Sequence, residues 1–249
     1  MKLGIIGGNG VAATNLLNTM IEQQLTHAGA YRDCHHPEII TWQATNVPSR
    51  SMYLEGRGES FIPGYVEIGT QLKNLGCQQL CMCCNTAHFA IDELTSKIGI
   101  PFFNMVEQVI ARAMQSPAKR IGLIASDGCL KGRVYEKYLS PSQLERMVYP
   151  DADFQKMVTA GICNVKNANR FLPTDNENNP QNQFEQVCRF LHSKSAELII
   201  LGCTDIAVSF QRVEYDECPI LNSLQVLCDM ICQWVYDHNF SPNTEGKRT

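Results

Sequence analysis

Hydrophobic and polar residues alternate along this chain on two length scales. Short apolar runs are separated by longer stretches in which apolar residues recur every three to four positions, the spacing of an amphipathic helix. This alternation predicts βα units and a parallel sheet. The expected strands are Leu3–Ile6, Glu38–Trp42, Gln79–Cys83, Phe102–Asn104, Ile121–Ala125, Glu145–Tyr149, Leu198–Leu201 and Ile220–Leu221.

The stretches between these runs predict helices. Gly29 and Gly76 stand where helix C-termini are expected, and Gly99-Ile100-Pro101 ends a third helix. The polar segment 174–183 is predicted to be an exposed loop. The expected helices are Val11–Ala28, Ser60–Leu75, Ala87–Ile98, Val106–Met114, Gly128–Leu139, Phe184–Lys194 and Leu224–His238.

The chain resembles itself at a spacing of about 118 residues. The segment 2–10, which ends in Gly7-Gly8-Asn9-Gly10, aligns with the segment 120–128, which ends in Ala125-Ser126-Asp127-Gly128. Cys84 and Cys203, 119 positions apart, each follow an apolar strand, and similar segments begin at Pro101 and at Pro219. Because these matches are collinear, we predict two pseudo-symmetric α/β halves, each a four-stranded parallel sheet flanked by helices.

The repeat sets the expected domain boundaries. We predict an N-terminal α/β domain at residues 1–117 and a C-terminal α/β domain at 118–222. The helix at 223–238 is expected to return to the first domain, and residues 239–249 to form a flexible tail. Two such domains leave a cleft between the carboxyl ends of their strands, where parallel sheets place ligands.

Composition narrows the class of protein. A net charge of −4 argues against a nucleic-acid-binding protein, which usually carries a basic excess. The 12 cysteines lie mostly in apolar runs and helices, as free thiols do in a reducing compartment. No apolar run approaches the roughly 18 residues of a membrane span, and the chain start lacks the apolar stretch of a secretory signal. We therefore expect a soluble cytoplasmic protein with no membrane or nucleic-acid partner.

Cys84 and Cys203 carry the candidate chemistry. Each stands between a strand and a helix, where backbone N–H groups favour a thiolate, and each is followed by a small hydroxyl residue, Thr86 or Thr204. Pseudo-symmetry would make the two thiols face each other across the cleft. One thiolate could then remove a proton from a carbon atom while the opposite thiol delivers one to the other face. The alternative is that both are buried strand-end residues without a catalytic role.

Other motifs point less clearly to a function. Cys81 and Cys84 have the C-x-x-C spacing of redox proteins, but Cys81 lies within an apolar run, which favours a buried strand position. Adding His88 gives too few ligands for a structural zinc site, so we expect no metal. Gly8-Asn9-Gly10-Val11-Ala12-Ala13 fits a dinucleotide-binding turn, yet the second strand ends without the acidic residue that holds a ribose. The same turn could hold a small carboxylate.

Three segments together resemble the aspartate/glutamate racemase family, and its aspartate racemase branch in particular. They are Gly7-Gly8-Asn9-Gly10-Val11-Ala12-Ala13-Thr14, Cys84-Asn85-Thr86-Ala87-His88 and Gly202-Cys203-Thr204-Asp205. The resemblance extends to about residue 238. It departs from the family pattern at Asn9, Val11 and Asp205, where Met, Pro and Glu are usual. The Asp-Ser-Gly that opens the glutamate branch is absent, which favours the aspartate branch.

The resemblance implies cofactor-independent racemisation of an acidic amino acid, aspartate or alternatively glutamate, in a protein that is often a homodimer. Cys84 and Cys203 fall on the two catalytic positions. Arg50, in Pro48-Ser49-Arg50, and Lys166, after Val165, match the residues that contact the two substrate carboxylates. By themselves, these two residues would more often be solvated surface charges. Further expected substrate-binding residues are Asn9, Gly10, Asn85, Thr86 and Thr204.

Other functions remain open on the same scaffold. A decarboxylase or a cis-trans isomerase of a small dicarboxylate could use one cysteine or use the pair differently. A binding protein could also hold acidic amino acids in the same cleft without converting them. The presence of both cysteines favours racemisation.

Overall fold

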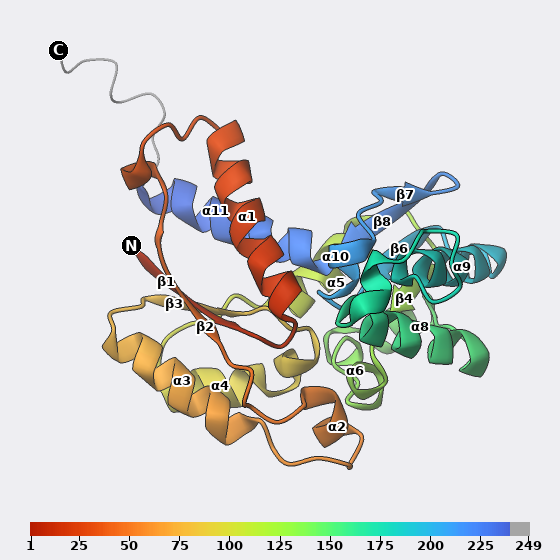
Figure 1. The fold of residues 1–249 in the computed structure, drawn as a ribbon, viewed down its shortest axis with the longest axis horizontal. Helices are drawn as coiled ribbons and strands as arrows, with labels where there is room; N and C mark the ends of the chain where they lie inside the picture. The colour runs from red at the N-terminus through yellow and green to blue at the C-terminus, as the bar shows by residue number, and fades with distance from the viewer. Residues whose placement is uncertain (240–249) are drawn as a thin grey trace.

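The structure, a computed structural model, describes residues 1–239 and contains two sheets (Figure 1). In the first sheet the strand order is β2-β1-β3, and both pairings are parallel. These strands are Lys2–Gly7 (β1), Glu38–Gln43 (β2) and Gln79–Met82 (β3). The predicted strand at Phe102–Asn104 is reduced to a single parallel bridge between Phe102 and Leu80.

The second sheet has the strand order β5-β4-β6-β8-β7. All its pairings are parallel except that of β7 with β8. The predicted α/β class with parallel sheets is confirmed, but the prediction of four strands in each sheet is wrong: the first sheet has three strands and the second has five. The additional strand of the second sheet, β7, was not predicted. It forms a hairpin whose turn residues, Asp216 and Glu217, have positive φ angles of 44° and 62°. The strands are Ile121–Ile124 (β4), Met147–Val148 (β5), Leu198–Leu201 (β6), Glu214–Tyr215 (β7) and Cys218–Asn222 (β8).

Helices cover both sheets. In Figure 1, α1 and α11 lie on one side of the first sheet, and α3 and α4 lie on the other. The helices are α1 (Val11–His27), α2 (Arg50–Leu54), α3 (Ile62–Asn74), α4 (Ile91–Ile98), α5 (Met105–Gln115), α6 (Asp127–Lys131), α7 (Pro141–Leu144), α8 (Ala152–Val165), α9 (Pro180–Ser193), α10 (Ile206–Ser209) and α11 (Ser223–Asn239). Short 3-10 helices span Asp33–His35, Thr86–Ala90, Glu136–Tyr138 and Ala168–Phe171.

Several predicted helix ends are confirmed. Gly29, Gly76 and Gly99 follow α1, α3 and α4 with φ angles of 105°, 88° and 75°, a left-handed conformation that glycine adopts without strain. The predicted helix Gly128–Leu139 is wrong, because α6 ends at Lys131 and Arg133 then takes a φ of 51°. The predicted helix Ala87–Ile98 divides into a 3-10 turn followed by α4.

Two further differences from the prediction, an additional helix and an earlier helix start, lie in the second half. The helix α8 was not predicted, although Asp151 caps its N-terminus by accepting from the backbone of Asp153 and Phe154. The loop predicted at 174–183 ends early, because Asn179 caps α9 and Pro180 begins it. The end of α8 matters for function, since Lys166 follows it directly.

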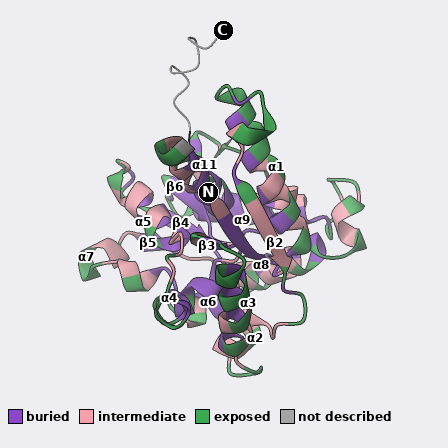
Figure 2. Ribbon diagram, turned by 90° about the vertical axis from the view of Figure 1, so that its left-hand side faces the viewer, coloured by how far each residue is buried: buried purple, intermediate pink, exposed green. Residues whose placement is uncertain are grey.

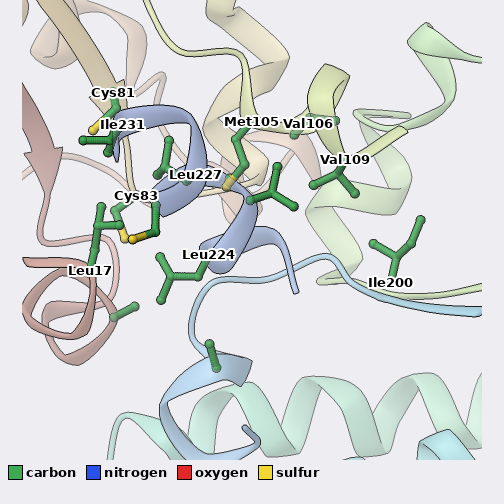
Figure 3. Packing of buried hydrophobic residues seen from close by; sticks show 14 of the residues in the cluster. Leu17, Cys81, Cys83, Met105, Val106, Val109, Ile200, Leu224, Leu227 and Ile231 are labelled. Carbon is green, nitrogen blue, oxygen red and sulfur yellow. The ribbon is translucent and has the colours of Figure 1, made fainter. Parts of the chain in front are cut away.

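One continuous cluster of buried apolar side chains includes strands of both sheets. It contains Leu3 and Ile5 of β1, Ile121 and Leu123 of β4, and Leu227 of α11. Figure 3 shows α11 side chains packed beside Cys81 and Cys83 of the first half. Buried residues gather in the interior strands, and exposed residues lie on the outer surfaces of the helices (Figure 2).

The helix α11 contacts α1 and α5, two helices of the first half. The boundaries at 117/118 and 222/223 stay predictions, and residues 240–249 of the predicted tail lie outside the described part of the chain. All 12 cysteines are free thiols. Within residues 1–239, no helix has the length and apolar character needed to cross a membrane.

Candidate active site

A cavity of about 250 Å³ is lined by residues of both halves, and Cys84 and Cys203 both belong to its lining. A second cavity of about 810 Å³ adjoins it, and the two share Asn9, Ser49, Arg50, Lys166 and Asp205. The structure therefore brings all the predicted site residues together. Those on the inner cavity are Asn9, Arg50, Cys84, Asn85, Thr86, Lys166, Cys203 and Thr204, while Gly10 lines the outer one.

Cys84 follows β3 and precedes the 3-10 turn that begins at Thr86. Its backbone carbonyl lies 2.8 Å from Nδ1 of His88, and Nε2 of the same ring accepts from the backbone N–H of Met105 at 3.3 Å. Burial lowers the pKa of His88 to about 4, so the ring is neutral at pH 7. Because Nε2 accepts, Nδ1 carries the proton and donates to the Cys84 carbonyl. His88 thereby ties the cysteine loop to the start of α5.

Cys203 occupies the equivalent place after β6. The hydroxyl of Thr204 donates to the carbonyl of Cys83 at 3.2 Å, which links the two cysteine loops directly. Burial raises the pKa of the Cys203 thiol well above its ordinary value, and the carboxylate of Asp205 raises it further. Cys203 is therefore protonated at neutral pH.

Lys166 and Asp205 form an ion pair, with 3.0 Å between Nζ and Oδ2. The Asp205 side chain is 5% exposed and that of Lys166 is 48% exposed, so the carboxylate is the buried partner. Burial raises the pKa of Asp205, and the charge of Lys166 opposes that shift. Oδ1 of Asp205 also lies so close to Gly10 that a Cβ there would approach it to 1.8 Å. Only glycine fits at position 10.

Arg50 begins α2 and is partly committed to the backbone. Its Nη1 donates to the carbonyls of Val47, at 3.2 Å, and Pro48, at 2.9 Å. Its Nε is buried and has no hydrogen-bond partner. Oδ1 of Asn9, whose Nδ2 donates to Tyr65, and Oδ1 of Asp205 are also buried without partners. Such atoms are costly unless a ligand satisfies them.

Asn85, Thr86 and Thr204 hydrogen-bond within the protein. The Asn85 amide accepts from Tyr135 at 2.6 Å and donates to Ser223 at 3.0 Å. The hydroxyls of Thr86 and Ser126 are 3.1 Å apart. The side chain of Asn85 is thus held in place by α11 and by the segment that follows α6.

Several residues of the cavity wall were not predicted. Asp127 lines the inner cavity and accepts from Gln155 at 2.7 Å and from Thr159 at 2.8 Å. It stands 118 positions after Asn9, so the internal repeat already contained the signal for it. Glu55 and Arg57 line the same wall and pair with each other, and no feature of the sequence pointed to them.

Comparisons with known proteins agree on one family. The sequence profile described as Asp/Glu/Hydantoin racemase matches residues 6–231. The chain is 24% identical over 224 residues to the broad specificity amino-acid racemase RacX of Bacillus subtilis, covering 89% of this chain and 92% of RacX.

Solved structures share the fold. Picrophilus torridus aspartate racemase matches with a TM-score of 0.77 and 22% identity over 94% of each chain. Glutamate racemase from Campylobacter jejuni matches with a TM-score of 0.60 and 20% identity, covering 94% of this chain and 86% of the other. At these identities the structural similarity shows that the fold is shared.

Proposed function

The chain belongs to the Asp/Glu/hydantoin racemase family and is an amino-acid racemase, and we propose that it acts through two cysteines without a cofactor. The observation that carries this proposal is that Cys84 and Cys203, the repeat-related thiols, line one cavity of about 250 Å³. That volume suits a small amino acid rather than a dinucleotide or a polymer.

In the proposed reaction, a thiolate at one cysteine takes the proton from the substrate α-carbon. The electron pair of the broken C–H bond passes into the substrate carboxylate, and the thiol of the other cysteine gives its proton to the opposite face. One thiol and one thiolate remain, with their roles exchanged. The high pKa of Cys203 supports a starting state in which Cys203 is the proton donor.

Arg50 is the proposed anchor for a substrate carboxylate, because its buried Nε still lacks an acceptor. The sequence favours aspartate as the substrate, with glutamate as the alternative, and Lys166 is the proposed contact of the second carboxylate. The similarity to RacX, which is named a broad specificity racemase, supports a second candidate, an amino acid that is not acidic.

Solvent exchange tests the reaction. The protein is incubated with L-aspartate, L-glutamate and a panel of neutral and basic L-amino acids in heavy water without added cofactor. We expect the D-enantiomer to appear while deuterium enters at the α-carbon, measured by chiral chromatography and NMR. Binding without exchange of any amino acid would instead leave a binding protein, and carbon dioxide release would indicate a decarboxylase.

Single cysteine variants test the assignment of roles. Cys84→Ala and Cys203→Ala should each lower the racemisation rate by about 10²–10⁴-fold, the usual contribution of a positioned acid or base. Cys34→Ala, at an exposed thiol that lines neither cavity, is the matched control and should keep the full rate. An unchanged rate in either of the first two variants would exclude the two-base mechanism.

A further inference from the structure

A buried tyrosine, Tyr135, contacts both of the loops that carry Cys84 and Cys203. Its side chain is 2% exposed, and it directly precedes the 3-10 helix Glu136–Tyr138. Two residues earlier, Arg133 takes a φ of 51°, so the chain leaves the helical path after α6. The break that ends α6 thus places a large polar side chain in the interior, between the two cysteine loops.

The ring of Tyr135 lies against the loop of Cys203. Gly202 precedes this cysteine, and a Cβ at Gly202 would lie 3.1 Å from Cε2 of Tyr135. The backbone N–H of Gly202 donates to the carbonyl of Ile124 at 2.7 Å, which fixes this part of the loop to the end of β4. The ring therefore packs against a backbone that is itself held in place, and the second half determines where the hydroxyl lies.

The hydroxyl of Tyr135 reaches the other cysteine loop. It donates to Oδ1 of Asn85 at 2.6 Å, and Asn85 directly follows Cys84 and lines the inner cavity. Burial raises the pKa of Tyr135 well above its usual range, so the hydroxyl keeps its proton at neutral pH. One side chain thus connects the residue before Cys203 with the residue after Cys84.

The hydrogen bonds of Asn85 determine what its amide offers to a ligand. An asparagine amide has one acceptor oxygen and two N–H bonds. The oxygen accepts from Tyr135, and Nδ2 donates to the hydroxyl of Ser223 at 3.0 Å. Within residues 1–239, no second acceptor takes the other N–H bond. Because Asn85 lines the inner cavity, this N–H is available to a bound substrate.

Tyr135 is the partner that decides this orientation of the amide. The hydroxyl of Ser223 both donates and accepts, so by itself it would bind either end of the Asn85 amide. A phenol hydroxyl is more acidic than that of serine and is therefore the stronger donor, which favours the oxygen of Asn85 on the side of Tyr135. With the amide reversed, Asn85 would turn an acceptor instead of a donor toward the cavity.

We infer that Tyr135 is a positioning residue for racemisation, because its hydroxyl holds the Asn85 amide with an N–H bond turned to the substrate carboxylate. The inference rests on the proposed function and adds a residue that lines neither cavity. In the proposed reaction the electron pair of the C–H bond passes into that carboxylate, so its negative charge grows in the transition state. The N–H of Asn85 then stabilises the transition state more than the bound substrate.

Tyr135→Phe tests this role, since it keeps the ring beside Gly202 and removes only the hydroxyl. With the amino acid that the wild-type protein racemises fastest, kcat/KM should fall by about tenfold or more, mainly through kcat. Tyr149→Phe is the matched control. It removes a hydroxyl that donates to Glu136 at 3.1 Å in the same half, and it should keep the full rate. An unchanged kcat/KM in Tyr135→Phe overturns the inference.

A double-mutant cycle with Asn85→Ala distinguishes positioning from a general effect on the fold. Because Tyr135 acts through Asn85, Tyr135→Phe should lower kcat/KM in the wild-type background but have little further effect in Asn85→Ala. If the tyrosine hydroxyl only stabilised the protein, both backgrounds would lose the same factor. Equal losses in the two backgrounds overturn the inference.

The cysteine variants separate this inference from the proposed function. If Cys84→Ala or Cys203→Ala keeps the full rate while Tyr135→Phe loses activity through Asn85, the inference stands and the two-cysteine mechanism fails. If the wild-type protein racemises none of the amino acids tested, calorimetric titration with the same amino acids decides. Tyr135→Phe should then bind several-fold more weakly than the wild type, and equal affinity or no binding to either protein overturns the inference.

Discussion

At the scale of single residues, the site depends on ionisable groups that burial or an ion pair holds in one protonation state. His88 is fully buried and neutral, and it connects the backbone of Cys84 to that of Met105. Cys203 is held as a thiol, and Asp205 is held as a carboxylate by Lys166. Each of these states has a measurable consequence for pH dependence.

His88 should make stability fall in acid. Its pKa of about 4 in the folded protein lies below its ordinary value of 6.5, so the unfolded chain binds a proton between these pH values while the folded protein does not. The contribution of neutral His88 to the free energy of unfolding is therefore fully present above pH 6.5 and is lost as the pH falls toward 4. The loss is at most about 3 kcal/mol, at 1.36 kcal/mol per unit of pKa difference.

Urea unfolding at pH 7 and pH 5, followed by tryptophan fluorescence, measures this loss. His88→Asn keeps a donor near Nδ1 and removes the titrating ring. The variant should be less stable at pH 7 but should lose less stability between pH 7 and pH 5 than the wild type. An equal loss in both proteins would contradict the assignment to His88.

Cys203 should set the alkaline limit of activity. The proposed reaction needs one thiol and one thiolate, so activity falls when both cysteines are ionised. Because burial and Asp205 raise the pKa of Cys203, activity should fall only at a pH above about 8.5, the ordinary pKa of a cysteine. Asp205→Asn removes a negative charge that raises the pKa of Cys203, so the fall in activity should move to lower pH. The kcat/KM profile from pH 6 to pH 11 checks both expectations, and a fall that stays in place would contradict the coupling.

At the scale of elements, the halves meet through the first turn of their first helices. Gly10 begins this contact in the first half, where Asp205 packs against it. The repeat-related Gly128 lies in α6, and its N–H donates to the Ser51 hydroxyl of α2 at 3.0 Å. Each half thus contributes a glycine that allows a side chain of the other half to approach closely.

Gly128→Ala should separate α2 from α6. The added Cβ would lie 2.4 Å from the Cα of Ser51, and overpacking of this kind costs about 1–3 kcal/mol. Because Arg50 is adjacent to Ser51, we also expect kcat/KM to fall by about 10²-fold, the effect of a small displacement of a binding group. Gly29→Ala, where a Cβ meets nothing within 4 Å, should lower the Tm through its positive φ but keep the activity. Equal activities in the two variants would contradict this role of Gly128.

At the scale of the whole molecule, one apolar cluster connects both sheets through α11. The helix returns from the second half and contacts α1 and α5 of the first. This arrangement couples the stability of the two halves, so the chain should unfold as one unit.

Leu227→Ala tests this coupling. Leu227 is fully buried in the cluster, and its truncation should cost about 2–5 kcal/mol. The transitions seen by circular dichroism and by tryptophan fluorescence should shift together and stay coincident. Leu75→Ala, at a side chain that is 53% exposed, should change stability by less than about 0.5 kcal/mol. Two separated transitions would contradict a shared core.

The sequence by itself determined the α/β class, most strands and the pair of cysteine loops, because apolar periodicity and an internal repeat are local or directly comparable features. Helix α8 was not predicted although Asp151 caps it, and strand β7 was not predicted because a strand of two residues leaves a weak pattern. The sequence also singled out Arg50 and Lys166, each as the cation that contacts one of two substrate carboxylates. Only the tertiary structure decided that Asp205 neutralises Lys166 while Arg50 keeps an unsatisfied donor, because burial and pairing depend on residues that lie far apart along the chain.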